Sequence, residues 1–490
     1  MFTNSKREEE VRNEEDDSER NKSTDPTKRV VKKLSKMFSK SNSKNIPEEK
    51  RDEDEDDVQD ASSHLADNTV VAKKLLELGE IFAKRRSDGN IIKMSPYVLV
   101  ACLAAANHIY AAIQVADPEL RNKLYDDCNT EKLKDDELMN VQYWLKYADW
   151  AYESNYDKLS KKLIKKGFTL MRHDKSSAAG RVAHYIAFCP KRKIGLISLK
   201  GTSTVADVLT DALGMTVEKD LRYKFHSKSQ SEKVTCHEGI YTAATRMADD
   251  TIDIVEHLFM PLKYQIIICG HSLGAGTACL LGLILRERIP TMRDSYPLHV
   301  YAYAPPPVLN HQACLECVPF ITSIVNNADM VTRMSMNNVA ALDLFLGKVK
   351  TILKEKKMMP TNLGGAIQFT KQMKSTNDSD KLLMTPKEID ELFHSAINDD
   401  NVDDSSNIYV PGRVICLYQK GTVKKNQDKD EKIVGVTVSD GGMKVLRAIA
   451  PSETCVTDHF VTSYQDNIDL LLSQSSIDET KKNNFFDFFS

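Results

Sequence analysis

Short runs of apolar residues, each ended by glycine, proline or aspartate, recur along the middle of the chain. Their length and their β-branched and aromatic content predict strands. The runs are RVAHYIAFCP, KIGLISLKG, YQIIICG, HVYAYAPPP and FITSIVNNAD, which end at residues 190, 201, 270, 307 and 329. Between them, residues 239–259 and 275–288 carry apolar side chains at helical spacing. Strands that alternate with helices predict an α/β fold with a mostly parallel sheet.

The segments on either side of this pattern differ from it. Residues 69–170 contain stretches such as VVAKKLLELGEIFAKR and VQYWLKYADWAYES, whose spacing predicts a helical region. Residues 336–407 are rich in Lys, Asn and Asp and interrupt the alternation, which predicts an insertion. Two late strands are expected in GRVICLYQKG and EKIVGVTVSD. We therefore expect an α/β core over residues 171–470, with the insertion inside it, and a tail over residues 471–490.

Two stretches lack charged residues for long enough to raise the question of a membrane span. Residues 94–116 are interrupted by Pro96, Asn107, His108 and Gln114, which favours a buried helix. Residues 264–285 contain four glycines, which argue against a spanning helix. The sequence therefore predicts no transmembrane anchor.

Charge changes the picture at the N-terminus. Residues 1–68 hold 14 basic and 19 acidic side chains and few apolar ones, so the segment is expected to be disordered. Within it, residues 28–40 (KRVVKKLSKMFSK) place apolar and basic side chains on opposite sides of a helix. Such a helix can lie on an anionic membrane. The alternative is a solvated basic patch that pairs with the acidic run EEKRDEDEDD.

The overall composition limits the partners. A formal net charge of −3 over 490 residues gives no reason to expect nucleic acid. The first residues are charged and lack the apolar segment of a secretory signal, so the ten scattered cysteines are expected to be reduced in the cytoplasm.

One short motif suggests chemistry. Gly270, His271, Ser272, Leu273 and Gly274 form a G-x-S-x-G pattern between a predicted strand and a predicted helix. This context is that of a nucleophile elbow, a sharp turn that exposes a reactive serine. Small residues are needed where the turn meets the neighbouring strand and helix. The alternative is a glycine-rich turn with no chemistry.

A nucleophilic serine needs a base and an acid that orients the base, in the chain order Ser, Asp/Glu, His for this kind of turn. Asp329 closes the next suitable strand, and His459 follows the last predicted strands. Each has an alternative, because Asp329 can be a turn cap and His459 a surface loop residue. Asp458 is a rival acid beside the base, but side chains adjacent in the chain seldom face each other. The other downstream histidines fit less well: His299 falls in a strand, His311 precedes the acid and His394 falls in the insertion.

The oxyanion of an acyl-transfer intermediate needs two backbone donors. Leu273 stands at the start of the helix, where its N–H is available. Thr202 follows the strand over residues 194–200 and can supply the second N–H. The alternative for Thr202 is an ordinary polar loop residue.

Six motifs in this order resemble those of a known family. GHSLGAGTA, KGTSTVADVLTD, CHEGIYTAA, YAPPP, NNADMVTR and TDHF are similar to the class 3 lipases, most closely the branch of the sn-1-specific diacylglycerol lipases. The resemblance covers about residues 90–470. It implies an α/β-hydrolase fold, the triad Ser272, Asp329 and His459, and the oxyanion donors Thr202 and Leu273. It also implies that His237 is a structural marker near the site and that the insertion occupies the place of a regulatory loop.

The chain departs from the family pattern in three motifs and in one domain. Lys200 replaces the usual Arg, Thr332 replaces a Pro, and YAPPP replaces YSPPG. The four-helix membrane domain of the animal diacylglycerol lipases is missing from the pattern, so a peripheral enzyme is expected, at an intracellular membrane or lipid-droplet surface.

The resulting expectation is a serine hydrolase that needs no cofactor or metal and cleaves a glycerolipid ester, such as diacylglycerol at sn-1. Phospholipase A1 or triacylglycerol lipase activity is the alternative within enzymes, and a catalytically inactive lipid-binding scaffold is the alternative outside them. Cys314 and Cys317 have the spacing of metal ligands but lack a second pair, which favours a helix. The tail KKNNFFDFFS can dock onto the domain or insert at a membrane surface.

Overall fold

The computed structural model describes residues 94–116, 130–176, 180–202, 214–221, 232–292, 296–375, 383, 388, 391, 407–420, 432–438, 446–452 and 454–474. The chain divides into two units, Met1–Leu65 and Ala66–Ser490, and every described residue belongs to the second. The predicted basic helix over residues 28–40 and the phenylalanine-rich tail lie outside the described residues.

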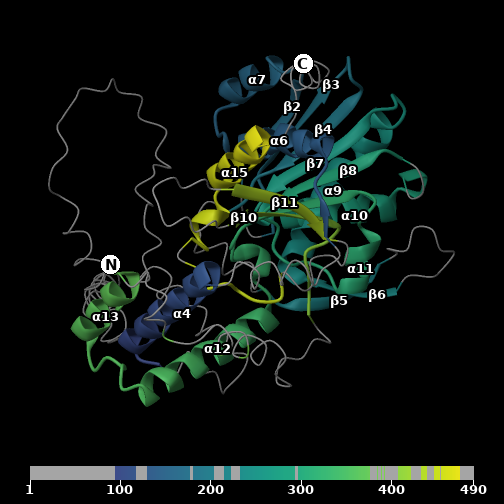
Figure 1. The fold of residues 1–490 in the computed structure, drawn as a ribbon. Helices are drawn as coiled ribbons and strands as arrows, with labels where there is room; N and C mark the ends of the chain where they lie inside the picture. Colours follow the sequence, from purple (N-terminus) through teal and green to yellow (C-terminus); the bar gives the residue numbers. More distant parts are fainter. Residues whose placement is uncertain are drawn as a thin grey trace, which may run out of the picture. The chain divides into compact units, whose positions relative to one another are not determined.

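A mostly parallel sheet organises the second unit (Figure 1). Among the described residues its strand order is β1-β11-β10-β9-β8-β7-β4-β3-β2. The neighbours from β4 through β7, β8 and β9 to β10 run parallel, and the outer pairs run antiparallel. The strands are β1 (Thr130–Lys132), β2 (Thr169–Asp174), β3 (His184–Cys189), β4 (Ile194–Leu199), β7 (Gln265–His271), β8 (Leu298–Tyr303), β9 (Ile321–Asn326), β10 (Arg413–Lys420) and β11 (Lys432–Val438).

A second, two-stranded antiparallel sheet joins β5 (Thr216–Leu221) to β6 (Glu232–His237). The described α-helices are α4 (Pro96–Ala116), α6 (Asp135–Asp149), α7 (Tyr156–Ile164), α9 (Glu238–Ile254), α10 (Leu273–Arg288), α11 (His311–Glu316), α12 (Met336–Glu355), α13 (Leu363–Ser375) and α15 (Val461–Gln474). Short 3-10 turns η2 (Trp150–Tyr152), η4 (Pro290–Met292), η5 (Val331–Arg333) and η7 (Thr457–His459) and a π-helix η3 (Val255–Phe259) connect them.

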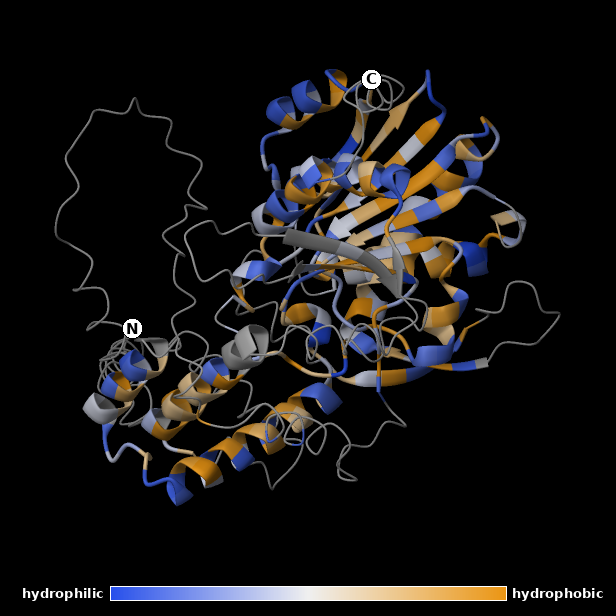
Figure 2. Ribbon diagram, in the orientation of Figure 1, coloured by the Kyte–Doolittle hydropathy of each residue, from blue (hydrophilic) through white to orange (hydrophobic). Residues whose placement is uncertain are grey.

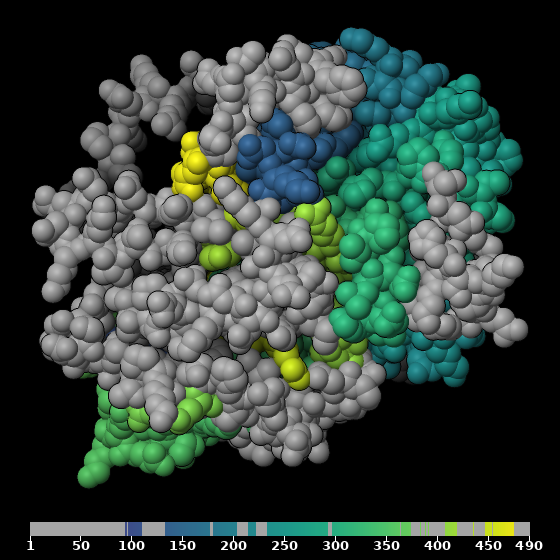
Figure 3. Space-filling view, turned by 45° about the vertical axis from the view of Figure 1, so that its right-hand side comes forward, coloured from purple at the N-terminus to yellow at the C-terminus, as the bar shows by residue number. Residues whose placement is uncertain are grey.

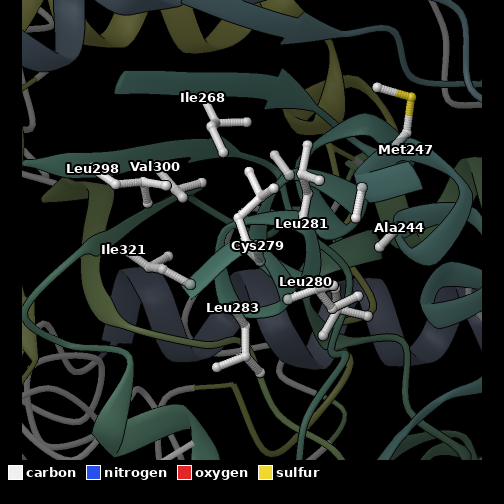
Figure 4. Packing of buried hydrophobic residues seen from close by; sticks show 14 of the residues in the cluster. Ala244, Met247, Ile268, Cys279, Leu280, Leu281, Leu283, Leu298, Val300 and Ile321 are labelled. Carbon is white, nitrogen blue, oxygen red and sulfur yellow. The ribbon is translucent and has the colours of Figure 1, made fainter. Parts of the chain in front are cut away.

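One face of the sheet is covered by α9 and α10. Apolar side chains of β7, β8 and β9, such as Ile268, Val300 and Ile321, pack against Leu281 of α10 (Figure 4). Strands in the middle of a parallel sheet are buried on both faces, so they read as continuous apolar runs, as the sequence does here. This core holds β7 and α10 rigidly, and the turn between them carries Ser272.

The opposite face is covered by α6 and α15, which pack on the sheet through a second apolar cluster. Tyr143, Trp144 and Tyr147 of α6 contribute three of its aromatic side chains. Arg413 of β10 pairs with Glu137 and links α6 to the sheet. In the space-filling view, the blue segment near residues 130–160 meets the teal and green segments of the sheet and its helices on one face (Figure 3).

Three further helices, α4, α12 and α13, pack together beside the α/β core (Figure 1). In Figure 2 much of the ribbon of α12 and part of that of α4 is orange, which marks their hydrophobic residues. The same cluster includes Ala328, Met330 and Val331 on one turn and Cys455 and Val456 on another. This helical layer therefore supports the two turns that carry Asp329 and His459.

The α/β fold and the predicted strands of the core are confirmed, and residues 96–116 form a helix with a largely buried face. A bilayer crossing needs a long, uninterrupted apolar helix, and none of the described helices meets that requirement. The predicted insertion contains α12 and α13, and the domain boundaries remain predictions.

The structure also contains elements that the pattern did not predict. The strands β2, β5 and β6 are absent from the predicted set, and α15 runs across the expected boundary at residue 470. β1 and the first residues of β2 fall in a segment for which only helices were expected. β5 has a mostly polar, partly exposed sequence, TVEKDL, so it lacks the apolar alternation that marks a half-buried strand.

Candidate active site

Ser272 lies in a strained turn between β7 and α10. Its φ of 60° and ψ of −129° are unusual for a residue with a side chain. A Cβ on Gly270 would lie 2.5 Å from the carbonyl oxygen of Gly274, and one on Gly274 would lie 2.4 Å from that of Leu199. Both glycines are therefore required by close backbone approach, as the motif predicted. The turn has the geometry of a nucleophile elbow.

Ser272, His459 and Asp329 are in hydrogen-bond contact. The Ser272 hydroxyl lies 2.9 Å from Nε2 of His459. Nδ1 of His459 lies 3.0 and 3.1 Å from the two carboxylate oxygens of Asp329. A carboxylate only accepts, so Nδ1 carries the hydrogen and Nε2 is free to accept the serine proton. The tertiary structure thus brings together three residues that are far apart in sequence.

The Asp329 carboxylate is buried but well supplied with donors. The Tyr464 hydroxyl donates to it at 2.8 Å, and the Val331 N–H donates at 2.9 Å. Burial pushes its pKa upward, but His459 and these donors outweigh burial and hold the pKa of Asp329 below its ordinary value. The carboxylate therefore stays charged and can stabilise a protonated His459.

Asp458, the rival acid, has a different position. Its Oδ2 accepts from the Ala328 N–H at 3.0 Å, the Asn327 side chain at 3.1 Å and the Thr454 hydroxyl at 2.8 Å. It therefore ties the turn before Asp329 to the turn that carries His459, and its hydrogen bonds go to these groups and not to the imidazole. Of the two carboxylates, Asp329 is the one that contacts the His459 imidazole.

Asp458 should leave a mark on the pH dependence of stability. Burial, reinforced by the charge of Asp329, raises the pKa of Asp458 from 3.8 to about 6. The folded protein then holds a proton that the unfolded chain has lost between about pH 4 and pH 6, so folding stability falls as pH rises through this window. A shift of about two pKa units lowers the free energy of unfolding by about 3 kcal/mol at most.

Asp458→Asn removes this titrating group. We expect the unfolding free energy of the variant, minus that of the wild type, to increase by up to about 3 kcal/mol between about pH 4 and pH 7. Urea unfolding of both proteins at several pH values measures this difference. A difference that is constant with pH would contradict the assignment.

Thr202 and Leu273 lie on the two sides of the serine. Leu273 is the first residue of α10, and Thr202 follows β4, which pairs in parallel with β7. A Cβ on Gly201 would lie 3.0 Å from Cβ of Ser272 and 2.5 Å from the carbonyl oxygen of His271. The backbone that leads into Thr202 therefore passes directly beside the nucleophile, where an oxyanion donor is needed. Its donor role stays a prediction.

The remaining histidines have other partners. His299 bonds the Thr322 hydroxyl at 2.9 Å, and burial lowers its pKa to about 4. His237 caps α9 and accepts from the Ile240 N–H at 3.2 Å. His311 begins α11, and His394 lies outside the described residues.

Cys314 lies in α11 and Cys317 directly follows it; both are buried free thiols, and burial raises their pKa values well above the ordinary range. Among the described residues, no group of three or more His, Cys, Asp or Glu side chains is placed to hold a metal ion.

Two side chains beside the triad were missed or only partly recognised in the sequence. Tyr152, on η2, bonds His271 from a position 119 residues upstream. His271 was predicted only as part of the elbow motif, yet its ring also contacts the backbone of His459. No local pattern marks either contact, because both depend on how distant turns meet.

The chain is similar in sequence to one family of known proteins and in structure to several solved ones. Residues 196–339 match the family model described as Lipase (class 3). The chain is 30% identical over 152 residues to diacylglycerol lipase-beta of Mus musculus, covering 30% of this chain and 21% of that protein. It is 27% identical over 171 residues to diacylglycerol lipase-alpha of Homo sapiens, covering 32% of this chain and 15% of that protein. The matched part thus spans about a fifth or less of these relatives.

Among solved structures, the triacylglyceride lipase of Rhizomucor miehei aligns with a TM-score of 0.36 and 17% identity, over 42% of this chain and 77% of that one.

Proposed function

We propose that the chain, whose residues 196–339 match the Lipase (class 3) model, is a serine hydrolase that cleaves a fatty-acyl ester of a glycerolipid. The observation that carries the proposal is the contact of His459 with both Ser272 and Asp329. A binding protein would need neither a base beside the serine nor a charged, buried carboxylate behind that base.

The proposed reaction has two steps. His459 Nε2 takes the Ser272 proton while Oγ attacks the acyl carbonyl carbon, and the Asp329 carboxylate stabilises the imidazolium. The N–H groups of Thr202 and Leu273 stabilise the oxyanion, with about 3–4 kcal/mol typical for such a donor. His459 then gives its proton to the leaving glycerolipid alcohol. Water, activated by the same histidine, releases the fatty acid from the serine.

Diacylglycerol, cleaved at sn-1, is the substrate we propose. It is supported by the names of the two curated relatives, which are diacylglycerol lipases. Such a substrate lies in a lipid surface, so we propose peripheral contact with an intracellular membrane or a lipid droplet from the cytoplasm. Ser272 is only 1% exposed and His459 3%, so both side chains lie beneath the surface of the protein.

The test is hydrolysis of mixed micelles by the purified full chain. Diacylglycerol, phosphatidylcholine and triacylglycerol are offered in parallel, and the released acyl chains are identified by position. We expect fatty acid release from sn-1 of diacylglycerol to be the fastest of the three reactions. Faster release from phosphatidylcholine or triacylglycerol would replace the proposed substrate. If micelles bind but no fatty acid appears, the enzyme proposal fails and a lipid-binding scaffold becomes the better account.

A further inference from the structure

The imidazole of His271, next to Ser272 in the chain, makes a hydrogen bond at each ring nitrogen. Its Nε2 lies 2.8 Å from the backbone carbonyl oxygen of His459. Its Nδ1 lies 2.9 Å from the Tyr152 hydroxyl. A carbonyl oxygen only accepts, so Nε2 must carry the hydrogen. Nδ1 is then the acceptor, and the Tyr152 hydroxyl donates to it.

The Tyr152 hydroxyl also has a partner on the other side. The Gly201 N–H donates to its oxygen. A Cβ on Gly201 would lie 2.3 Å from that oxygen, so only glycine allows this approach. The hydrogen bonds therefore run in one direction: from Gly201 N–H to Tyr152, from Tyr152 to His271, and from His271 to the His459 carbonyl. This series of hydrogen bonds begins at Gly201, one residue before Thr202, and ends at the backbone carbonyl of His459, the proposed catalytic base.

Burial keeps this chain of hydrogen bonds neutral. His271 is 5% exposed, and burial together with the neighbouring His459 lowers its pKa to about 3. Burial also raises the pKa of Tyr152 above its ordinary range. Neither ring therefore changes charge near neutral pH. Their contribution is therefore geometric.

We propose that Tyr152 and His271 are positioning residues that couple the oxyanion loop at Gly201–Thr202 to the turn that carries His459. The inference rests on the proposed function of Ser272, His459 and Asp329. Tyr152 and His271 hold the His459 backbone and the Gly201 backbone at fixed positions on either side of the serine. Base and oxyanion donors are thereby placed as a single unit, which the transition state needs and substrate binding does not.

Tyr152→Phe keeps the ring and removes only the hydroxyl that joins the two halves. We expect kcat to fall by about 10- to 100-fold, the size of effect produced by small misplacements in an active site. KM should change by less than about twofold, because the hydroxyl contributes to geometry and not to uniform binding.

Tyr185→Phe is the matched control. It also loses a buried hydroxyl: Tyr185, on β3, donates to the backbone carbonyl of Tyr147 on α6 at 2.8 Å and not to a residue of the proposed triad. Its kcat should stay at the wild-type value, whatever it loses in stability. Equal kcat values for the two variants would overturn the proposal.

A second measurement needs neither activity nor a folded Tyr152 variant. Nitrogen NMR of ¹⁵N-histidine-labelled wild-type protein reports which ring nitrogen of His271 carries the hydrogen, with assignment by the signal lost in His271→Gln. We expect hydrogen on Nε2 alone and no titration near neutral pH. Hydrogen on Nδ1 would overturn the proposal. If the wild type releases no fatty acid and this signal is as expected, the proposed function has failed while the hydrogen-bond chain stands.

Discussion

Ser272→Ala is expected to lower kcat for ester hydrolysis by about 10⁵- to 10⁶-fold, the size found when a triad nucleophile is removed. Among the described residues, the hydroxyl that hydrogen-bonds Nε2 of His459 is that of Ser272, so His459 has no alternative nucleophile to activate there. The fold should be retained, because the substitution removes one oxygen and the strained turn keeps a Cβ. The measurement is turnover of a short-chain ester together with labelling by a fluorophosphonate probe.

Ser198→Ala is the matched control for this experiment. Ser198 is also fully buried, and its hydroxyl donates to the Tyr147 carbonyl at 2.8 Å. This variant should keep both turnover and labelling. If Ser272→Ala is still labelled or keeps more than about a thousandth of the wild-type kcat, Ser272 is not the nucleophile, since the residual catalysis of a triad without its serine is far smaller.

Asp329→Asn is expected to lower kcat by about 10⁴-fold, as in triads where the acid becomes an amide. The carboxylate accepts at both oxygens, from Nδ1 of His459 and from the Tyr464 hydroxyl. An amide has one accepting oxygen, so its NH₂ group must face one of these donors. If it faces His459, the ring takes the wrong tautomer and Nε2 can no longer accept the serine proton. The loss should appear in kcat with little change in KM.

Asp458→Asn separates the two candidate acids. The amide oxygen can still accept from the Ala328 N–H and the Thr454 hydroxyl, so the turn keeps most of its support. We expect its kcat to fall by no more than about tenfold, because no transition-state charge depends on it. Similar losses in the two variants, measured on the same ester at about pH 8, would show that the acid has been assigned to the wrong residue.

Local pattern was sufficient for the elements that form the middle of the sheet. Strands such as β7 and β8 are buried on both faces, so nearly all their residues are apolar and the run is visible without neighbours. The elbow was equally visible, because its two glycines are demanded by backbone contacts within a few residues of Ser272 or on the adjoining strand. The edge strand β5 was not visible in the sequence, because the pattern of a mostly polar, partly exposed strand resembles that of a loop.

Candidate triad members could be named from chain order, but order alone did not choose between Asp329 and Asp458. Both carboxylates are buried, and each hydrogen-bonds a residue of the other's turn: Asp458 accepts from Asn327, and Asp329 contacts His459. Adjacency to His459 argued against Asp458, and the structure then shows that the Asp329 carboxylate faces the imidazole.

The sequence by itself determined an α/β core, a strained serine turn and a short set of partners for that serine, because these depend on burial and on neighbours close in the chain. Only the tertiary structure decided that Asp329 faces His459, that Asp458 braces the two turns, and that Tyr152 reaches His271. These contacts join segments more than one hundred residues apart. Their geometry is set by how the helices α6, α12 and α15 and the sheet pack together, which depends on the whole core at once.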